Sequence, residues 1–95
     1  MDKIRDYLPD AEILAQLAEE ASELTQAALK LRRVLDGTNP TFVEYEKAMV
    51  NLIEEYGDVV TCLNELDISY DSFLVALKKE RWIRRLRARI DRDED

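Results

Sequence analysis

The sequence contains no histidine. This absence excludes serine–histidine and cysteine–histidine nucleophiles, and it excludes helical zinc sites of the His-Glu-x-x-His type. It also argues against a di-iron bundle, because such bundles take ligands from Glu-x-x-His pairs. Any chemistry of this chain must therefore depend on carboxylates, lysines and arginines.

Glycine and cysteine are almost as scarce. Two glycines are too few for a loop that cradles phosphates, and the single cysteine, Cys62, allows neither an internal disulfide nor a thiolate zinc cluster. The longest apolar run, Phe73 to Leu77, is too short to span a membrane. The first residues, MDKIRDYLPD, lack the apolar region of a secretory signal. We therefore expect a cytoplasmic protein.

The charged residues are unevenly distributed along the chain. Residues 1 to 77 contain sixteen Asp and Glu but six Lys and Arg, whereas residues 78 to 92 contain eight Lys and Arg and two acidic residues. Because an acidic body disfavours general nucleic-acid binding, we expect no nucleic-acid partner. A single domain of 95 residues also has a thin core, which favours self-association.

Apolar residues recur at helical spacing and predict an all-α fold. A first helix should begin near Pro9 and Asp10 and end at about Leu35, before Gly37. Its apolar stripe is Ile13, Leu17, Leu24, Ala28, Leu31 and Leu35. We expect one domain, residues 1 to 95, with three main helices and a short N-terminal turn or helix in residues 1 to 8. Oligomerisation would complete this bundle.

A second helix is predicted to follow the GTNP turn. Thr41 should cap it, with Glu44 completing a capping box. Its apolar stripe is Tyr45, Met49, Leu52, Tyr56, Val59, Leu63 and Leu66. After a short connection at residues 67 to 69, Ser69 or Asp71 can cap a third helix that runs to about residue 90. The charged residues 91 to 95 are expected to form a disordered tail.

The third helix has two apolar faces. Its first half should bury one side of the helix, and that side carries Tyr70, Phe73, Leu74 and Leu77. Its second half turns nearly the opposite side outward, with Trp82, Ile83, Leu86 and Ile90. A straight helix with two apolar faces needs two partners. We therefore expect the second face to contact another subunit, giving a homodimer or a homotetramer.

An acidic pattern occurs twice, as LAEEASEL at residues 17 to 24 and as LIEEYGDV at residues 52 to 59. On helices that turn about 100° per residue, Glu20 and Glu55 take the same position relative to Leu17 and Leu52. Glu23 and Asp58 follow one turn later on the same flank of their helices. A short turn makes the two helices antiparallel neighbours, so these four carboxylates should meet beside the apolar seam.

Carboxylates that converge in this way repel one another, which raises their pKa values unless a cation neutralises them. Mg²⁺ prefers oxygen ligands and commonly binds through carboxylates together with substrate phosphates. The repeated pattern therefore predicts one metal site built from two helices. The alternative is that both Glu-Glu pairs are solvated surface charges, which are common on helices.

The paired motif resembles that of the MazG-like, all-α nucleoside triphosphate pyrophosphohydrolases, and the small phage and bacterial members in particular. The two halves read Glu19-Glu20-Ala21-Ser22-Glu23 and Glu55-Tyr56-Gly57-Asp58. The flanking stretches NPT (39 to 41), NLIEEYGDV (51 to 59) and KKERWIRRL (78 to 86) are also similar. The resemblance covers about residues 11 to 87. The 31 residues between Glu23 and Glu55 exceed the usual family spacing, so the subfamily and the substrate stay open.

The resemblance implies a MazG-like bundle and a house-cleaning hydrolase that cleaves a nucleoside triphosphate between its α and β phosphates. The products are a nucleoside monophosphate and pyrophosphate. The cofactor would be Mg²⁺, with Mn²⁺ as a substitute. The implied metal ligands are Glu20, Glu23, Glu55 and Asp58. Glu19 or Glu54 would orient or deprotonate the attacking water, unless they are simply surface charges.

The basic segment has two interpretations. Lys78 and Arg81 are the favoured candidates to bind substrate phosphates. Alternatively, the cations solvate the end of the helix and complement its dipole. Trp82 could stack on a base, but packing is the simpler role for it. A different functional class also fits the sequence, namely a non-catalytic dimeric adaptor that binds a partner through its amphipathic helices.

Overall fold

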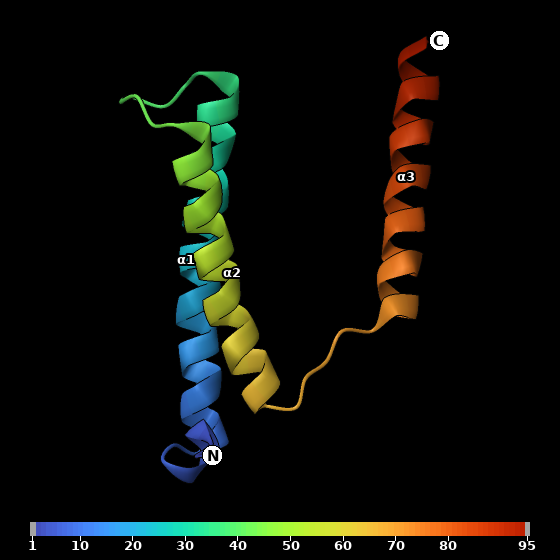
Figure 1. Ribbon diagram of the computed structural model, residues 1–95. Coiled ribbons are helices and arrows are strands. Elements are labelled where there is room, and N and C mark those ends of the chain that lie inside the picture. The colour runs from blue at the N-terminus through green and yellow to red at the C-terminus, as the bar shows by residue number, and fades with distance from the viewer. Residues whose placement is uncertain (1, 95) are drawn as a thin grey trace.

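The computed structural model describes residues 2 to 94, and every regular element within them is helical. A short 3-10 helix, η1 (Ile4–Asp6), precedes three long helices, α1 (Asp10–Asp36), α2 (Tyr45–Glu65) and α3 (Ser72–Glu94) (Figure 1). The predicted all-α class and the three main helices are therefore confirmed. None of the helices in this range is long and apolar enough to cross a membrane.

The end of α1 follows from its sequence. Gly37 adopts φ 76°, a left-handed conformation that glycine reaches without steric cost. In this conformation the amides of Gly37 and Thr38 both donate to the carbonyl oxygen of Arg33. The Asp36 carboxylate also accepts hydrogen bonds from the backbone and the hydroxyl of Thr38, and these bonds lower the pKa of Asp36. The predicted stop before Gly37 is confirmed.

The predicted start of the second helix is wrong. α2 begins at Tyr45, with Glu44 at its N-cap position, and the Glu44 side chain makes no capping hydrogen bond in the structure. Thr41 therefore does not form a capping box with Glu44. The turn after α1 continues instead, because the Asn39 side chain donates to the carbonyl oxygen of Thr41 and holds that residue in the loop.

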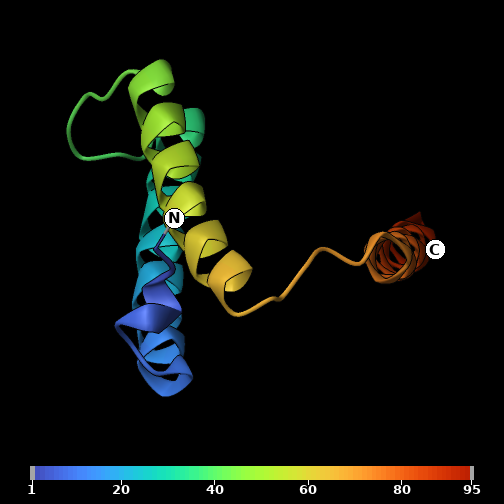
Figure 2. The same ribbon diagram turned by 60° about the horizontal axis from the view of Figure 1, so that its bottom comes forward.

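α1 and α2 pack as an antiparallel hairpin with a thin core (Figures 1 and 2). The buried side chains of the described residues are Ile13, Ala27, Leu31, Ala48 and Cys62. Several residues of the predicted stripes are half-buried along the seam. Others are exposed, contrary to prediction, and these are Ala28, Leu35, Tyr45 and Tyr56. In the described part of the chain α1 and α2 pack mainly against each other, so residues at the edge of each stripe stay in contact with solvent.

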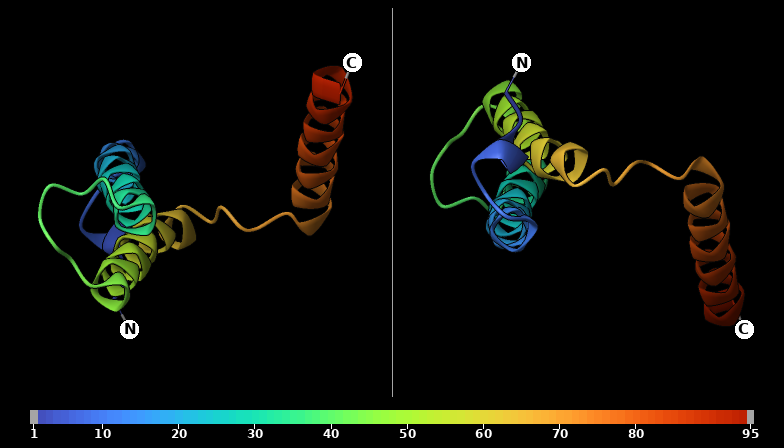
Figure 3. Two further views of the ribbon diagram at one scale, coloured as in Figure 1. Left: turned by 90° about the horizontal axis from the view of Figure 1, so that it is seen from above. Right: turned by 90° about the horizontal axis from the view of Figure 1, so that it is seen from below.

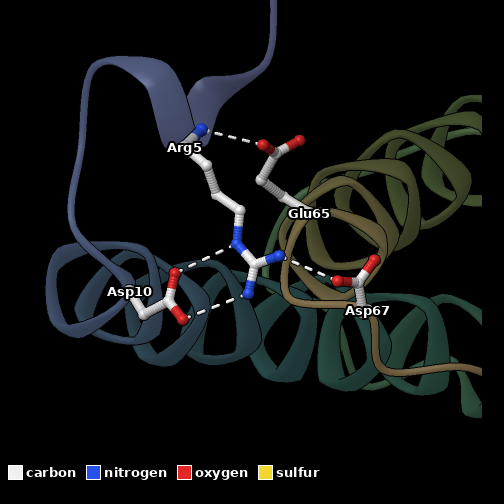
Figure 4. A network of polar contacts seen from close by, with 4 residues as sticks. All are labelled: Arg5, Asp10, Glu65 and Asp67. Atoms are coloured by element: carbon white, nitrogen blue, oxygen red, sulfur yellow. Dashed lines mark hydrogen bonds and ion pairs between the residues drawn. The ribbon is translucent and has the colours of Figure 1, made fainter.

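Arg5 ties the N-terminal segment to both helices at the open end of this hairpin, opposite the loop that joins them (Figure 4). Its guanidinium donates to both carboxylate oxygens of Asp10 at 3.1 Å and to Asp67 at 2.8 Å. Its backbone amide donates to Glu65 at 2.8 Å. These contacts join η1, the first turn of α1 and the end of α2. Asp67 has φ 58°, an unusual value for a residue other than glycine.

α3 begins as the sequence predicts. The backbone amide of Leu74 donates to the Asp71 carboxylate at 2.9 Å, so Asp71 is the cap of this helix. The helix continues through residues 91 to 94, where a disordered tail was expected, and residue 95 lies outside the described residues.

α3 stands apart from the α1–α2 hairpin, at the end of an extended connection (Figures 1 and 3). Tyr70, Phe73 and Leu74 are exposed, so the prediction that they pack within the chain is wrong. The residues of the second face, Trp82, Ile83, Leu86 and Ile90, are exposed as well. The radius of gyration is accordingly 17.9 Å, against about 13 Å for a compact chain of this length. Within residues 2 to 94, α3 therefore does not form a bundle with α1 and α2.

Candidate metal centre

The acidic residues meet where α1 and α2 lie side by side. Glu20 and Glu23 come from the middle of α1, and Glu55 comes from the facing stretch of α2. One carboxylate oxygen of each residue lies within 4.8 Å of the corresponding oxygens of the other two. We call this group the three-glutamate centre. The prediction that the two motifs converge is correct for these three residues.

Glu55 is the least hydrated member of the centre. Its side chain is half-buried, and its Oε2 atom is fully shielded without a hydrogen-bond partner in the described part of the chain. Burial raises the pKa of the Glu55 carboxyl, and the charges of Glu23, Asp58, Glu20 and Glu54 raise it further. An orphaned, shielded carboxylate oxygen is costly, so it needs either a proton or a cation.

Asp58 lies at the edge of the centre. It is exposed and is not among the three residues whose oxygens converge. Its charge nevertheless contributes to the raised pKa of Glu55, which sits one turn earlier on α2. The structure therefore brings three of the four predicted ligands together and leaves the fourth beside them.

Two further side chains belong to this region and were missed from the sequence. Gln16 donates from Nε2 to Glu20 at 2.7 Å and so orients that carboxylate. The signal was available, because residues four apart on a helix are neighbours. Cys62 is buried, and burial together with the charges of Glu20 and Asp58 raises the pKa of its thiol. The thiol therefore stays protonated and is not a ligand for a hard cation.

The chemistry of these side chains fits a divalent cation. Mg²⁺ takes oxygen ligands at about 2.1 Å, so oxygens bound to one ion lie at most about 4.2 Å apart. Small side-chain rotations of the exposed Glu23 and the half-buried Glu20 would bring the carboxylate oxygens of the centre within that distance of one another. Within residues 2 to 94, the ion pairs of the chain do not involve Glu20, Glu23 or Glu55. Their negative charge is therefore available to a metal ion.

Glu19 and Glu54, the candidates for activating water, are both exposed. Glu54 adds to the raised pKa of Glu55, which places its charge near the centre. Glu19 is not among the residues whose charges raise the pKa of Glu55.

The candidate phosphate-binding residues, Lys78 and Arg81, lie on α3 and are exposed. Because α3 stands apart from the hairpin, the single chain does not bring these cations to the three-glutamate centre (Figure 1). Trp82, on the same helix, is exposed rather than packed within the chain. The role of these two cations in binding substrate phosphates therefore stays a prediction.

Comparison with known proteins adds no relative, since no family model, no curated protein and no solved structure matches this chain.

Proposed function

We propose that this protein is a Mg²⁺-dependent nucleotide pyrophosphohydrolase. It would cleave ribonucleoside or deoxyribonucleoside triphosphates to the monophosphate and pyrophosphate, and so clean the nucleotide pool. One observation carries the proposal, which is the convergence of Glu20, Glu23 and Glu55 on two antiparallel helices. The resemblance of the paired motif to the MazG-like family supports the same reaction.

In this proposal Glu20, Glu23 and Glu55 hold the cation, and Asp58 completes the ligand set. When bound there, Mg²⁺ would supply neutralisation of phosphate charge and a lower pKa for bound water. Gln16 keeps Glu20 in position through its hydrogen bond. Glu54, an exposed carboxylate next to Glu55, orients the attacking water and accepts its proton, with Glu19 as the other candidate for this role. Phosphoryl transfer needs such positioning and electrostatics more than a covalent nucleophile.

The proposed enzyme works as a homodimer or homotetramer. The exposed apolar face of α3 (Trp82, Ile83, Leu86 and Ile90) gives the reason, because the single chain leaves it in water. A second copy would bury this face and supply the missing part of the bundle. The same packing would bring cations of α3, including Lys78 and Arg81, toward an acidic hairpin.

The test is incubation with a panel of ribonucleoside and deoxyribonucleoside triphosphates, with and without Mg²⁺. We expect metal-dependent release of pyrophosphate from at least one of them. Glu55→Gln should abolish the release, whereas Glu46→Gln should leave it unchanged, because Glu46 lies in the exposed first turn of α2. Release of single phosphates, or no release across the panel, would contradict the proposal.

A second candidate function has a specific observation in its favour. The long amphipathic α3 exposes apolar residues on both of its faces, which suits a non-catalytic adaptor that binds a partner helix. A dimeric adaptor of this kind would use the acidic stripe for solubility. It would show no specific binding of Mg²⁺ or Mn²⁺, so a metal titration separates the two functions.

A further inference from the structure

An open groove of about 710 Å³ lies at the end of the hairpin where the loop 38 to 44 joins α1 to α2. In Figures 1 and 2 this loop bulges away from the two helices. The residues of the groove that matter here are Lys30, Phe42, Glu44, Lys47, Asn51 and Glu54. Val43, Ala48 and Val50 make much of the remaining lining apolar.

The groove adjoins the three-glutamate centre. Asn51 precedes Glu55 by four residues on α2, which is one turn or about 6 Å along the helix axis. Lys30 follows Glu23 by seven residues on α1, which is two turns on the same face. A molecule whose reacting phosphate lies at the centre therefore meets the groove with the part that extends along the hairpin.

The charges of the groove favour a neutral, hydrogen-bonding group over a chain of phosphates. Lys30 and Lys47 take part in none of the ion pairs found in residues 2 to 94. Glu44 and Glu54 line the same groove and would repel an anion. The two lysines, the two carboxylates and the Asn51 amide together offer both donors and acceptors, as the edge of a base and a sugar require.

Phe42 supplies an apolar surface at this groove. Its side chain is 91% exposed, the largest exposure among the big apolar residues of the described chain. Leaving an aromatic ring in water costs free energy that a stacked base would recover. Ligand sites of this type combine apolar walls with a few polar groups that fix orientation.

We propose that this groove binds the nucleoside end of the substrate, with the base stacked on Phe42 and hydrogen-bonded by Asn51. The inference rests on the proposed function, because the three-glutamate centre fixes where the phosphates lie. It deepens that function by assigning the residues that select the base.

The test uses nucleoside 5′-monophosphates, the products of the proposed reaction, as probes. Amide resonances are followed by NMR while each monophosphate is added to the wild-type protein. We expect shifts that centre on Phe42 and Asn51. Phe42→Ala should weaken binding of the preferred monophosphate about tenfold or more, as expected for the loss of one stacked aromatic ring. Asn51→Ala should make the affinities for monophosphates with different bases nearly equal.

Tyr70→Ala is the matched control, because Tyr70 is likewise an exposed aromatic residue in a connection but lies outside the groove. It should leave monophosphate binding unchanged. Mg²⁺ affinity should stay the same in Phe42→Ala and Asn51→Ala, which shows that the folded centre is intact. If both groove variants bind every monophosphate as the wild type does, the proposal is overturned.

The hydrolysis assay tests the proposed function independently of the proposed groove. Pyrophosphate release with an unchanged base preference in both groove variants would overturn the groove and retain the activity. Shifts at Phe42 and Asn51 without any hydrolysis would retain the groove as a nucleoside site and overturn the activity. The absence of both shifts and hydrolysis would overturn both proposals.

Discussion

Glu23 and Glu55 stand on antiparallel helices, and one carboxylate oxygen of each lies within 4.8 Å of the other. Two like charges at this distance destabilise the folded chain unless a proton or a cation compensates them. Burial raises the pKa of the Glu55 carboxyl, and the neighbouring charge of Glu23 raises it further. The proposed cation site would account for this destabilising arrangement, since functional sites commonly trade stability for activity.

Removing one charge from the centre should leave the fold intact and abolish activity. We expect Glu20→Gln and Glu55→Gln to be as stable as the wild type, or more stable, when metal is absent, because repulsion is relieved without a change of shape. Pyrophosphate release should fall at least about 100-fold in both variants. Thermal melts with a chelator and the hydrolysis assay check the two halves of this prediction. A clear loss of metal-free stability in both variants would contradict it.

The stability of the metal-free protein should depend on pH through Glu55. Because the pKa of this carboxyl is raised in the folded state, the folded chain holds a proton at pH values where the unfolded chain has released it. The resulting stability is fully present below the ordinary glutamate pKa of about 4.3, and it is lost as pH rises through the folded value. Urea melts of wild type and Glu55→Gln between pH 4 and 7 measure this contribution of Glu55 to the free energy of unfolding.

We expect the wild type to lose stability relative to Glu55→Gln as the pH increases over that range. Glu46→Gln serves as the comparison, because it removes an exposed glutamate outside the centre. A difference between wild type and Glu55→Gln that does not change with pH would show that the carboxyl titrates normally.

Gly57 lies between Glu55 and Asp58 in the interior of α2, where glycine weakens a helix. A Cβ atom at this position would meet no side chain or backbone beyond its own helical turn and chain neighbours within 4 Å. Gly57→Ala should therefore stabilise the chain by roughly 0.5 to 1 kcal/mol, which corresponds to a rise of roughly 2 to 8 °C in melting temperature. Gly37→Ala should have the opposite effect, because Gly37 needs φ 76°. Calorimetry of the two variants checks both signs, and a Gly57→Ala variant that melts below wild type would be inconsistent with this environment.

Self-association should be visible in solution. We expect light scattering at micromolar concentration to give the mass of a dimer or a tetramer. Leu86→Glu should shift the mass toward the monomer, because it places a charge in the exposed apolar face of α3. Leu35→Glu is the control, since Leu35 is equally apolar and 68% exposed but lies on α1. A wild-type protein that stays monomeric would rule out the proposed assembly.

Much of the secondary structure could be predicted from local signals. Pro9 and Gly37 mark the ends of α1, and Asp71 caps α3, because these residues act on the backbone next to them. The start of α2 could not be predicted in the same way. The Thr41–Glu44 pattern competes with the turn contacts of Asn39, and the sequence does not show which of the two wins.

The tertiary arrangement was harder to predict from the sequence. The angular positions of Glu20, Glu23 and Glu55 on their helices correctly predicted that the three residues converge. This prediction succeeds because the hairpin turn fixes which helix faces meet. Helical phase could not place α3, whose two apolar faces find no partner among residues 2 to 94. The groove could not be predicted from the sequence either, since it depends on the path of the loop 38 to 44, which contributes Phe42 and Val43 to its lining.

The most direct test of the cation site is calorimetric titration of the chelator-treated protein with Mg²⁺ and with Mn²⁺. The wild type should bind both ions saturably. Glu55→Gln should bind at least about tenfold more weakly, because it loses a charged ligand with a shielded oxygen. Glu46→Gln should bind as the wild type does. If the wild type shows no saturable binding, or if Glu55→Gln binds with wild-type affinity, the three-glutamate centre is not a metal site.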